Sequence, residues 1–152
     1  MHKLVLAGLL VLFTLCGAAR AEKKPSPAFD PALAKELGAD ERGMRSYVLV
    51  ILKTGPHRVP EGPQRDEMFK VHFANIKRLA DEEKLAVAGP FDGKNEWRGL
   101  FILAVDTQKE AEALVATDPV IVNGEMVAEY HQLYASAALM ALPGLHARIS
   151  RE

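Results

Sequence analysis

The sequence contains a single cysteine, Cys16, among its 152 residues. Cys16 lies in an N-terminal apolar stretch that we expect to be removed, so the rest of the chain has no thiol nucleophile, disulfide bond or thiolate metal ligand. Basic residues are not clustered either, and the formal net charge is −1. Nucleic-acid binding needs a basic patch that neutralises phosphates, so we expect no nucleic-acid partner.

Several catalytic and metal-binding motifs are also missing. The sequence has no glycine-rich phosphate loop, no G-x-S-x-G nucleophile motif and no dinucleotide-binding fingerprint. Four histidines follow the N-terminal stretch, and no two of them have the i, i+4 spacing or the carboxylate context of a known metal motif: His57, His72, His131 and His146. We therefore predict neither a metal site nor a cofactor.

The first 21 residues have the three parts of a secretory signal peptide. Lys3 is followed by an apolar run from Leu4 to Cys16 and then by Ala19-Arg20-Ala21, a small-residue cleavage site. The apolar run is about 13 residues long, shorter than the roughly 20 that span a bilayer. We predict cleavage after Ala21, a secreted or periplasmic location, and no membrane span in the mature chain.

Residues 22–44 are predicted to form a leader in front of the folded domain. The stretch from Glu22 to Ala28 is polar and contains proline, and Asp30-Pro31 then offers an N-cap followed by a proline at the first helical position. Gly38 offers a stop, which predicts a short helix over residues 32–37. A loosely ordered linker is the alternative, because isolated helices of this length are marginal.

Residues 45–142 carry a domain in which strand and helix patterns alternate. Strands are predicted from β-branched and aromatic runs, and helices from apolar spacings of three and four residues and from a capping box at Thr107 and Glu110. The second of these helices should end near Asp118, because Pro119 disfavours helical dihedrals there. The predicted strands are 46–52, 84–88, 98–105 and 125–134, and the predicted helices are 64–83, 107–118 and 135–142, the last closed by Pro143-Gly144 before a tail of residues 143–152.

This βαββαβ order predicts an α+β, ferredoxin-like fold, in which an antiparallel sheet has its helices on one face. The strand at 46–52 is apolar on both faces, so the uncovered face would leave a large apolar surface in water. Two-fold pairing is the commonest way to bury such a face, which predicts a homodimer. Alternatively, the leader and the terminal helix cover this face within one chain.

Four segments in this order resemble the YCII-related (YciI-like) family of the dimeric α/β barrel superfamily. They are SYVLVILKTGP, MFKVHFANIKRLADEEKLAVAGP, GLFILAVDTQKEAEALVATDP and the strand after Asn123-Gly124. The resemblance spans residues 46–138 and implies that His72 and Asp118 line an active-site cleft. It also implies that Arg65 lies nearby and binds an anionic group of the substrate. The signal peptide and the leader are departures from short members of the family.

The residues themselves give a separate reason to select His72. It shares an apolar helical stripe with Met68 and Ile76, and a buried imidazole needs a hydrogen-bond partner. Asp118 could supply that partner if the two helices pack side by side on the sheet. The carboxylate would then fix the histidine tautomer, as in a general acid/base pair. The alternative is a structural pair that only ties the two helices together.

Two functions follow from these alternatives. The first is a small-molecule enzyme of the lyase or isomerase kind, in which His72 moves a proton, Asp118 orients it and Arg65 steadies an anionic group. The second is a non-catalytic small-molecule-binding or interaction module of the cell envelope.

Tyr130 and His131 are adjacent on a predicted strand and must point to opposite faces, and Tyr130 is expected to pack in the core or at the dimer interface.

Overall fold

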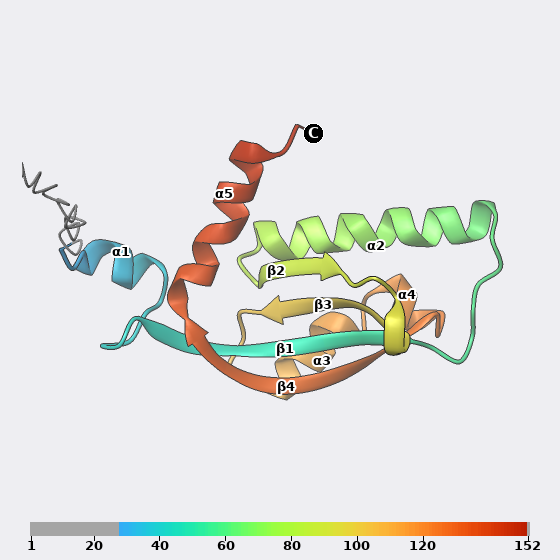
Figure 1. The fold of residues 1–152 in the computed structure, drawn as a ribbon, viewed down its shortest axis with the longest axis horizontal. Helices are drawn as coiled ribbons and strands as arrows, with labels where there is room; N and C mark the ends of the chain where they lie inside the picture. Colours follow the sequence, from blue (N-terminus) through green and yellow to red (C-terminus); the bar gives the residue numbers. More distant parts are fainter. Residues whose placement is uncertain (1–27, 152) are drawn as a thin grey trace, which may run out of the picture.

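The computed structural model describes residues 28–151, and the signal-peptide prediction lies outside this range. A four-stranded antiparallel sheet forms the centre, with the strand order β2-β3-β1-β4 (Figure 1). This order and the βαββαβ sequence confirm the predicted α+β, ferredoxin-like fold. The elements are α1 (Pro31–Glu36), β1 (Met44–Thr54), α2 (Pro63–Asp81), β2 (Leu85–Pro90), η1 (Lys94–Glu96), β3 (Trp97–Leu103), α3 (Gln108–Val115), α4 (Pro119–Val122), β4 (Met126–Ser136), η2 (Ala137–Ala141) and α5 (Leu142–Ile149).

The main core lies between the sheet and helices α2, α3 and α4. On this face Val50 of β1 is opposite Phe101 of β3 and Tyr130 of β4, because the side chains of an antiparallel sheet alternate between its two faces. Buried side chains from the sheet and from all three helices form one apolar cluster, and the half-buried Tyr130 packs against it. Tyr130 therefore packs in the core, one of the two roles expected for it.

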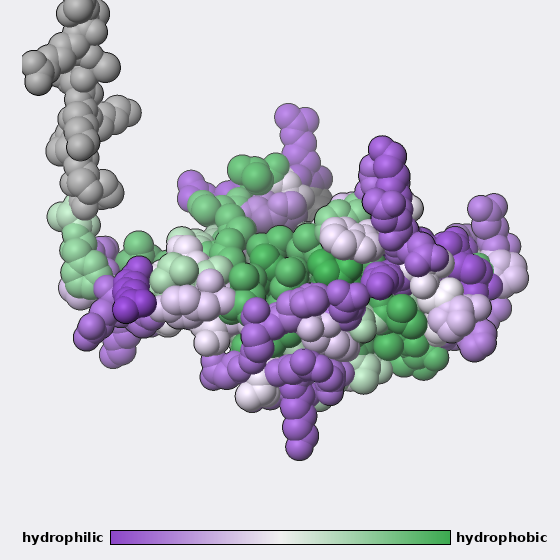
Figure 2. All heavy atoms as spheres, turned by 60° about the horizontal axis from the view of Figure 1, so that its bottom comes forward, coloured by the Kyte–Doolittle hydropathy of each residue, from purple (hydrophilic) through white to green (hydrophobic). Residues whose placement is uncertain are grey.

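The second face of the sheet is only partly covered. Tyr47 is fully buried there, and its hydroxyl donates a hydrogen bond of 3.0 Å to the carbonyl of Ser136. Leu139 and Met140 of η2 pack against the same cluster, so the chain covers one end of this face itself. Other apolar side chains at the edge of this cluster and beyond it stay partly exposed. Figure 2 shows apolar surface in the middle of the molecule with polar side chains around it. The partly exposed apolar side chains include Leu49, Val87, Leu100, Ile102 and Leu133.

Two of the predicted local signals are confirmed. Asp30 caps α1 by accepting hydrogen bonds from the backbone N–H groups of Ala32 and Leu33, at 3.0 and 3.1 Å. Thr107 and Glu110 form the capping box at the start of α3, in which each side chain accepts from the other residue's backbone N–H.

The predictions around two prolines missed the helix that each proline begins. The helix expected to reach Asp118 ends at Val115, and Asp118 instead starts the separate helix α4. The terminal helix expected over 135–142 is replaced by the end of β4 and by η2, and Pro143 begins α5 rather than closing a helix. The physical reason is the same in both places, since a proline stops a preceding helix and also fits the first turn of a new one.

The two terminal helices lie outside the buried core. None of the residues of α1 or α5 is buried, and α5 projects from the sheet near the end of α2 (Figure 1). Among residues 28–151 no helix has both the length and the apolar character that crossing a bilayer requires.

Candidate active site

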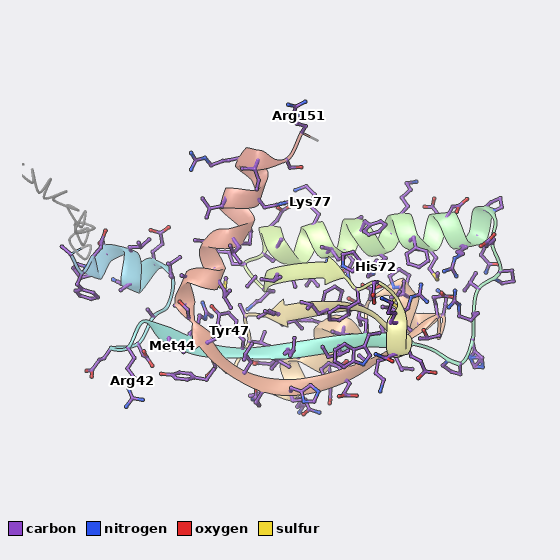
Figure 3. The ribbon with its side chains drawn as sticks, viewed as in Figure 1. Arg42, Met44, Tyr47, His72, Lys77 and Arg151 are labelled. Carbon is purple, nitrogen blue, oxygen red and sulfur yellow. The ribbon has the colours of Figure 1, made fainter. Side chains whose placement is uncertain are left out.

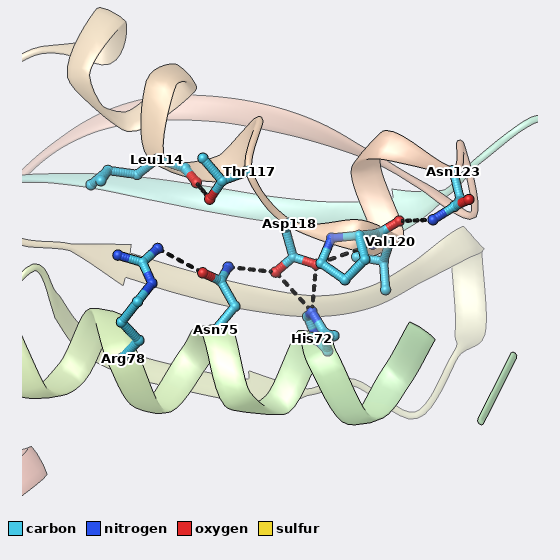
Figure 4. A network of polar contacts seen from close by, with 9 residues as sticks. His72, Asn75, Arg78, Leu114, Thr117, Asp118, Val120 and Asn123 are labelled. Carbon is cyan, nitrogen blue, oxygen red and sulfur yellow. Dashed lines mark hydrogen bonds and ion pairs between the residues drawn. The ribbon is translucent and has the colours of Figure 1, made fainter. Parts of the chain in front are cut away.

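The site predicted from the sequence brings His72 of α2 against Asp118, the residue before α4. The imidazole Nδ1 lies 2.9 Å from each carboxylate oxygen of Asp118 (Figure 4). Both side chains are buried, with 6% of His72 and none of Asp118 exposed. Helices α2 and α4 meet through this pair, whereas the prediction had α2 packing beside the longer helix expected over 107–118.

The Asp118 carboxylate accepts two further hydrogen bonds. Asn75, one turn after His72 on α2, donates from its amide at 3.1 Å, and the backbone N–H of Val120 donates at 3.1 Å. The second of these bonds makes Asp118 the N-cap of α4. Asn75 is itself held by Arg78, whose guanidinium donates to the amide oxygen at 2.7 Å (Figure 4). The carboxylate is thus fixed from three directions.

The other side of His72 faces a cavity of about 430 Å³ between α2 and the β2–β3 pair. Figure 3 shows His72 on the side of α2 that faces the sheet. Three phenylalanine rings surround the imidazole, with centroids 5.3 to 6.1 Å away: Phe69, Phe73 and Phe101. Its Nε2 makes no hydrogen bond to another residue of the described chain, because both bonds of the ring to Asp118 are made by Nδ1. His72 lines the cavity, so Nε2 is the ring nitrogen left for a ligand there.

This geometry defines the proton positions on the neutral imidazole. A carboxylate only accepts hydrogen bonds, so the proton of neutral His72 lies on Nδ1 and is donated to Asp118. The lone pair then lies on Nε2, on the cavity side. The arrangement has the chemistry of a general base whose orientation is fixed by a third group.

A second buried carboxylate, Glu125, lies just before β4. Its Oε1 is 2.8 Å from Arg65 Nη1, 3.2 Å from Arg58 Nε and 3.6 Å from Arg98 Nη1, while Oε2 accepts a 2.7 Å hydrogen bond from the Val59 N–H. Burial on its own raises the pKa of Glu125, but the Val59 N–H and the arginine charges outweigh it. The pKa of this carboxyl is therefore held below its usual value.

The loop after β1 reaches Glu125 because of a close backbone contact. The Gly55 N–H donates to the Glu125 carbonyl at 2.8 Å, and the His57 N–H donates to the Gly124 carbonyl at 3.0 Å. A Cβ at Gly55 would lie 2.1 Å from that Gly124 oxygen, closer than any side chain can approach. Glycine at position 55 therefore permits the loop that presents Arg58 and Val59 to the carboxylate.

The structure places Arg65 near the pair, but not in the cavity wall. Its guanidinium binds Glu125, donates to the Val59 carbonyl at 2.9 Å and lies 4.8 Å from the ring centroid of Phe69, which does line the cavity. Arg65 therefore lies behind the wall, where the buried Glu125 carboxylate offsets part of its positive charge. His131 is exposed on β4 and pairs with Glu129, so it belongs to the other face of the sheet.

Three residues of the site were not selected from the sequence: Asn75, Arg98 and Glu125. Asn75 carried a usable signal, because it follows His72 by three residues and thus lies on the same helix face. Arg98 and Glu125 stand at the ends of predicted strands, where charged residues are usually solvated, and only the packing of the loop shows that Glu125 is buried.

Residues 28–151 contain no group of three or more histidine, cysteine, aspartate or glutamate side chains that could hold a metal ion.

Comparisons with known proteins bear on the family. The model of the YCII-related domain matches residues 46–132. A solved structure that matches is a 5-chloro-2-hydroxyhydroquinone dehydrochlorinase from Burkholderia phenoliruptrix AC1100, in complex with 2,5-dihydroxybenzoquinone. That match has 20% sequence identity and a TM-score of 0.40, and it covers 55% of this chain and 90% of the other. The search of curated proteins gives no match.

Proposed function

The chain belongs to the YCII-related family, and we propose that it is a small-molecule enzyme in which His72 transfers a proton and Asp118 orients the imidazole. The observation that carries this proposal is the two-sided environment of His72. Its Nδ1 is held at 2.9 Å by Asp118, while Nε2 has no hydrogen bond within the described chain and the side chain lines a cavity of about 430 Å³. A purely structural pair would have no need of an unbonded nitrogen or of a cavity beside it.

The proposed reaction follows from the proton positions. Nε2 of neutral His72 removes a proton from the substrate, and the electron pair of the broken bond stays on the substrate. The imidazolium that forms is stabilised by the adjacent Asp118 carboxylate. Return of the proton to another substrate atom gives an isomerase, and its transfer to a departing group gives a lyase. Neither reaction draws on a metal or cofactor in this proposal.

Arg65 is proposed to support an anionic group of the substrate through its positive charge. Its contact with the Phe69 ring brings that charge to the back of the cavity wall. Charges act over several ångströms in a protein interior because the surrounding dielectric constant is lower than that of water.

We also propose that the protein is exported and acts as a homodimer. Export rests on the pattern of residues 1–21, and N-terminal sequencing of the protein from its host should begin at Glu22. The dimer rests on the half-exposed side chains of the second sheet face, including Leu49, Leu100 and Ile102. A second copy of the same face would remove them from water.

A non-catalytic binding module of the cell envelope is the second candidate function. One observation favours it: the Asp118 carboxylate also caps α4, so the pair has a structural role whether or not it transfers protons. The cavity would then bind a ligand without changing it.

Proton exchange with solvent separates the two candidates. We would screen small keto acids and hydroxylated aromatic acids in D₂O by ¹H NMR for catalysed loss of C–H signals. Wild-type protein should exchange at least one compound, and His72→Gln should slow this exchange by about 10²- to 10⁴-fold, the usual contribution of a general base. His146→Gln, at an exposed position on α5, is the control and should match wild type. Exchange that is unchanged in His72→Gln would rule out the proposed base.

A further inference from the structure

The arginine cluster around Glu125 carries more positive charge than its partner neutralises. Three guanidinium groups approach one carboxylate oxygen, at 2.8, 3.2 and 3.6 Å. Arginine stays protonated in proteins, and the lowered pKa of Glu125 keeps the carboxylate ionised at neutral pH. The cluster therefore has surplus positive charge beside the cavity that His72 lines.

Of these three arginines, Arg98 lies farthest from the Glu125 carboxylate. Its Nη1 is sealed 3.6 Å from Glu125 Oε1, and within the described chain neither atom has a hydrogen-bond partner. Arg65 has both a nearer ion pair and a hydrogen bond to the Val59 carbonyl. The Arg98 side chain as a whole is 20% exposed, so the part of its guanidinium away from Nη1 is the part that can meet a ligand. A buried donor without a partner costs free energy, and such groups are rare in folded proteins. Arg98 is also a lining residue of the cavity, unlike Arg58 and Arg65.

The rest of the cavity wall is apolar and partly aromatic. Four phenylalanines line it, Phe69, Phe73, Phe91 and Phe101, and its two ionisable side chains are His72 and Arg98. No carboxylate lines it, so an anion entering the cavity meets no like charge in the wall. A volume of about 430 Å³ lies within the range of small-molecule sites.

We propose that this cavity binds small, flat, aromatic or conjugated anions, and that Arg98 is the residue that contacts the anionic group. The phenylalanine rings offer faces and edges to a flat ligand, and the planar guanidinium suits a carboxylate or phenolate. The ligand's other end then reaches His72 Nε2. This inference names the substrate class of the proposed enzyme and rests on that proposal for its chemistry, although binding itself does not require turnover.

The test compares benzoate with benzamide, which has the same shape without the charge. Trp97 is the chain's one tryptophan, and its ring centroid is 5.4 Å from that of Phe91, so its fluorescence should report occupancy of the cavity. Wild-type protein should bind benzoate about tenfold more tightly than benzamide, the difference expected from one charge-assisted hydrogen bond. Arg98→Gln should reduce this ratio to about one.

Two controls use residues of the same cluster and cavity. Arg58→Gln removes an exposed partner of Glu125 that does not line the cavity, so the benzoate preference should persist. His72→Gln should lose proton exchange but still bind benzoate more tightly than benzamide. This result would separate the proposed base from the proposed anion contact. Two results would overturn the inference: a benzoate preference in Arg98→Gln equal to that of wild type, or no binding of benzoate to wild type. Neither result would change the outcome of the proton-exchange experiment, which tests the proposed base.

A measurement on unmodified protein covers the case in which Arg98→Gln does not fold. Arginine side-chain ¹⁵N NMR should show benzoate shifting the Nε–H signal of Arg98 and leaving that of the exposed Arg78 in place. An Arg98 signal that does not move at saturating benzoate would contradict the proposed contact.

Discussion

Asp118 and His72 are joined by both carboxylate oxygens, each 2.9 Å from the same imidazole nitrogen. The carboxylate also accepts from Asn75 and from the first turn of α4. One side chain therefore connects α2, α4 and the candidate active site, and substitutions at this position are expected to affect both tautomer and stability.

The tautomer of His72 should depend on Asp118. In wild-type protein we expect neutral His72 to carry its proton on Nδ1, because the carboxylate can only accept. In Asp118→Asn the side-chain amide can present an N–H to Nδ1, which favours the Nε2-protonated form. Long-range ¹H–¹⁵N NMR distinguishes the two tautomers directly. His146 in the same spectra is the internal control, and an unchanged His72 tautomer in the variant would show that Asp118 does not set it.

Replacement of Asp118 by alanine should destabilise the fold by about 2 to 3 kcal/mol. The loss combines an N-cap, worth about 1 kcal/mol, with a buried imidazole N–H and a side-chain amide left without an acceptor. Urea denaturation measures the change. Asp81→Ala, which removes an exposed ion pair with Lys77, should cost less than about 0.5 kcal/mol. Equal losses in the two variants would mean that the buried network contributes little.

The stability of the protein should depend on pH through Glu125. Its pKa is lowered in the folded state, so the folded chain binds this proton less tightly than the unfolded chain. The stabilising contribution is therefore complete above the ordinary pKa of 4.5 and is lost as the pH falls through the folded-state value. The difference in unfolding free energy between wild type and Glu125→Gln should shrink as the pH is lowered from 6 to below 4.5. The exposed Glu61→Gln should give a constant difference.

A lysine on the second sheet face should prevent the proposed dimer. Leu49 lies opposite Ile102 and His131 in the sheet, at the centre of the half-exposed apolar surface. Leu49→Lys would bury a charge in the interface and should give a monomer of unchanged fold, as measured by sedimentation and circular dichroism. Val122→Lys, on the exposed side of α4, is the control. A wild-type protein that is monomeric at high micromolar concentration would contradict the dimer.

The sequence predicted the fold well because its signals are local. Alternation in β1, the apolar stripe of α2 and the capping box of α3 each depend on neighbours within a few residues, and these suffice to order the elements. The ends of α3 and β4 were missed because proline at positions 119 and 143 is compatible with both a stop and a start.

The site was predictable to the extent that it lies on helices. His72 stands on the buried stripe of α2, and its need for a partner pointed to Asp118. Arg98 lies near the start of β3 and Glu125 just before β4, the two strands that flank β1. The loop after β1 reaches Glu125 through a backbone contact at Gly55 that no periodicity reveals. Long-range loop packing is set by tertiary contacts, so the arginine cluster became visible only in three dimensions.

The double role of the Asp118 carboxylate has a consequence for how such a protein can evolve. A lineage that lost its substrate would still be destabilised by loss of the cap on α4, so selection for a stable fold alone would favour the aspartate. An acid/base pair at His72 would then keep its orienting carboxylate through periods without use. New activities can then arise by changes in the cavity wall alone, at positions such as Phe73 and Ala88, which line the cavity and are exposed.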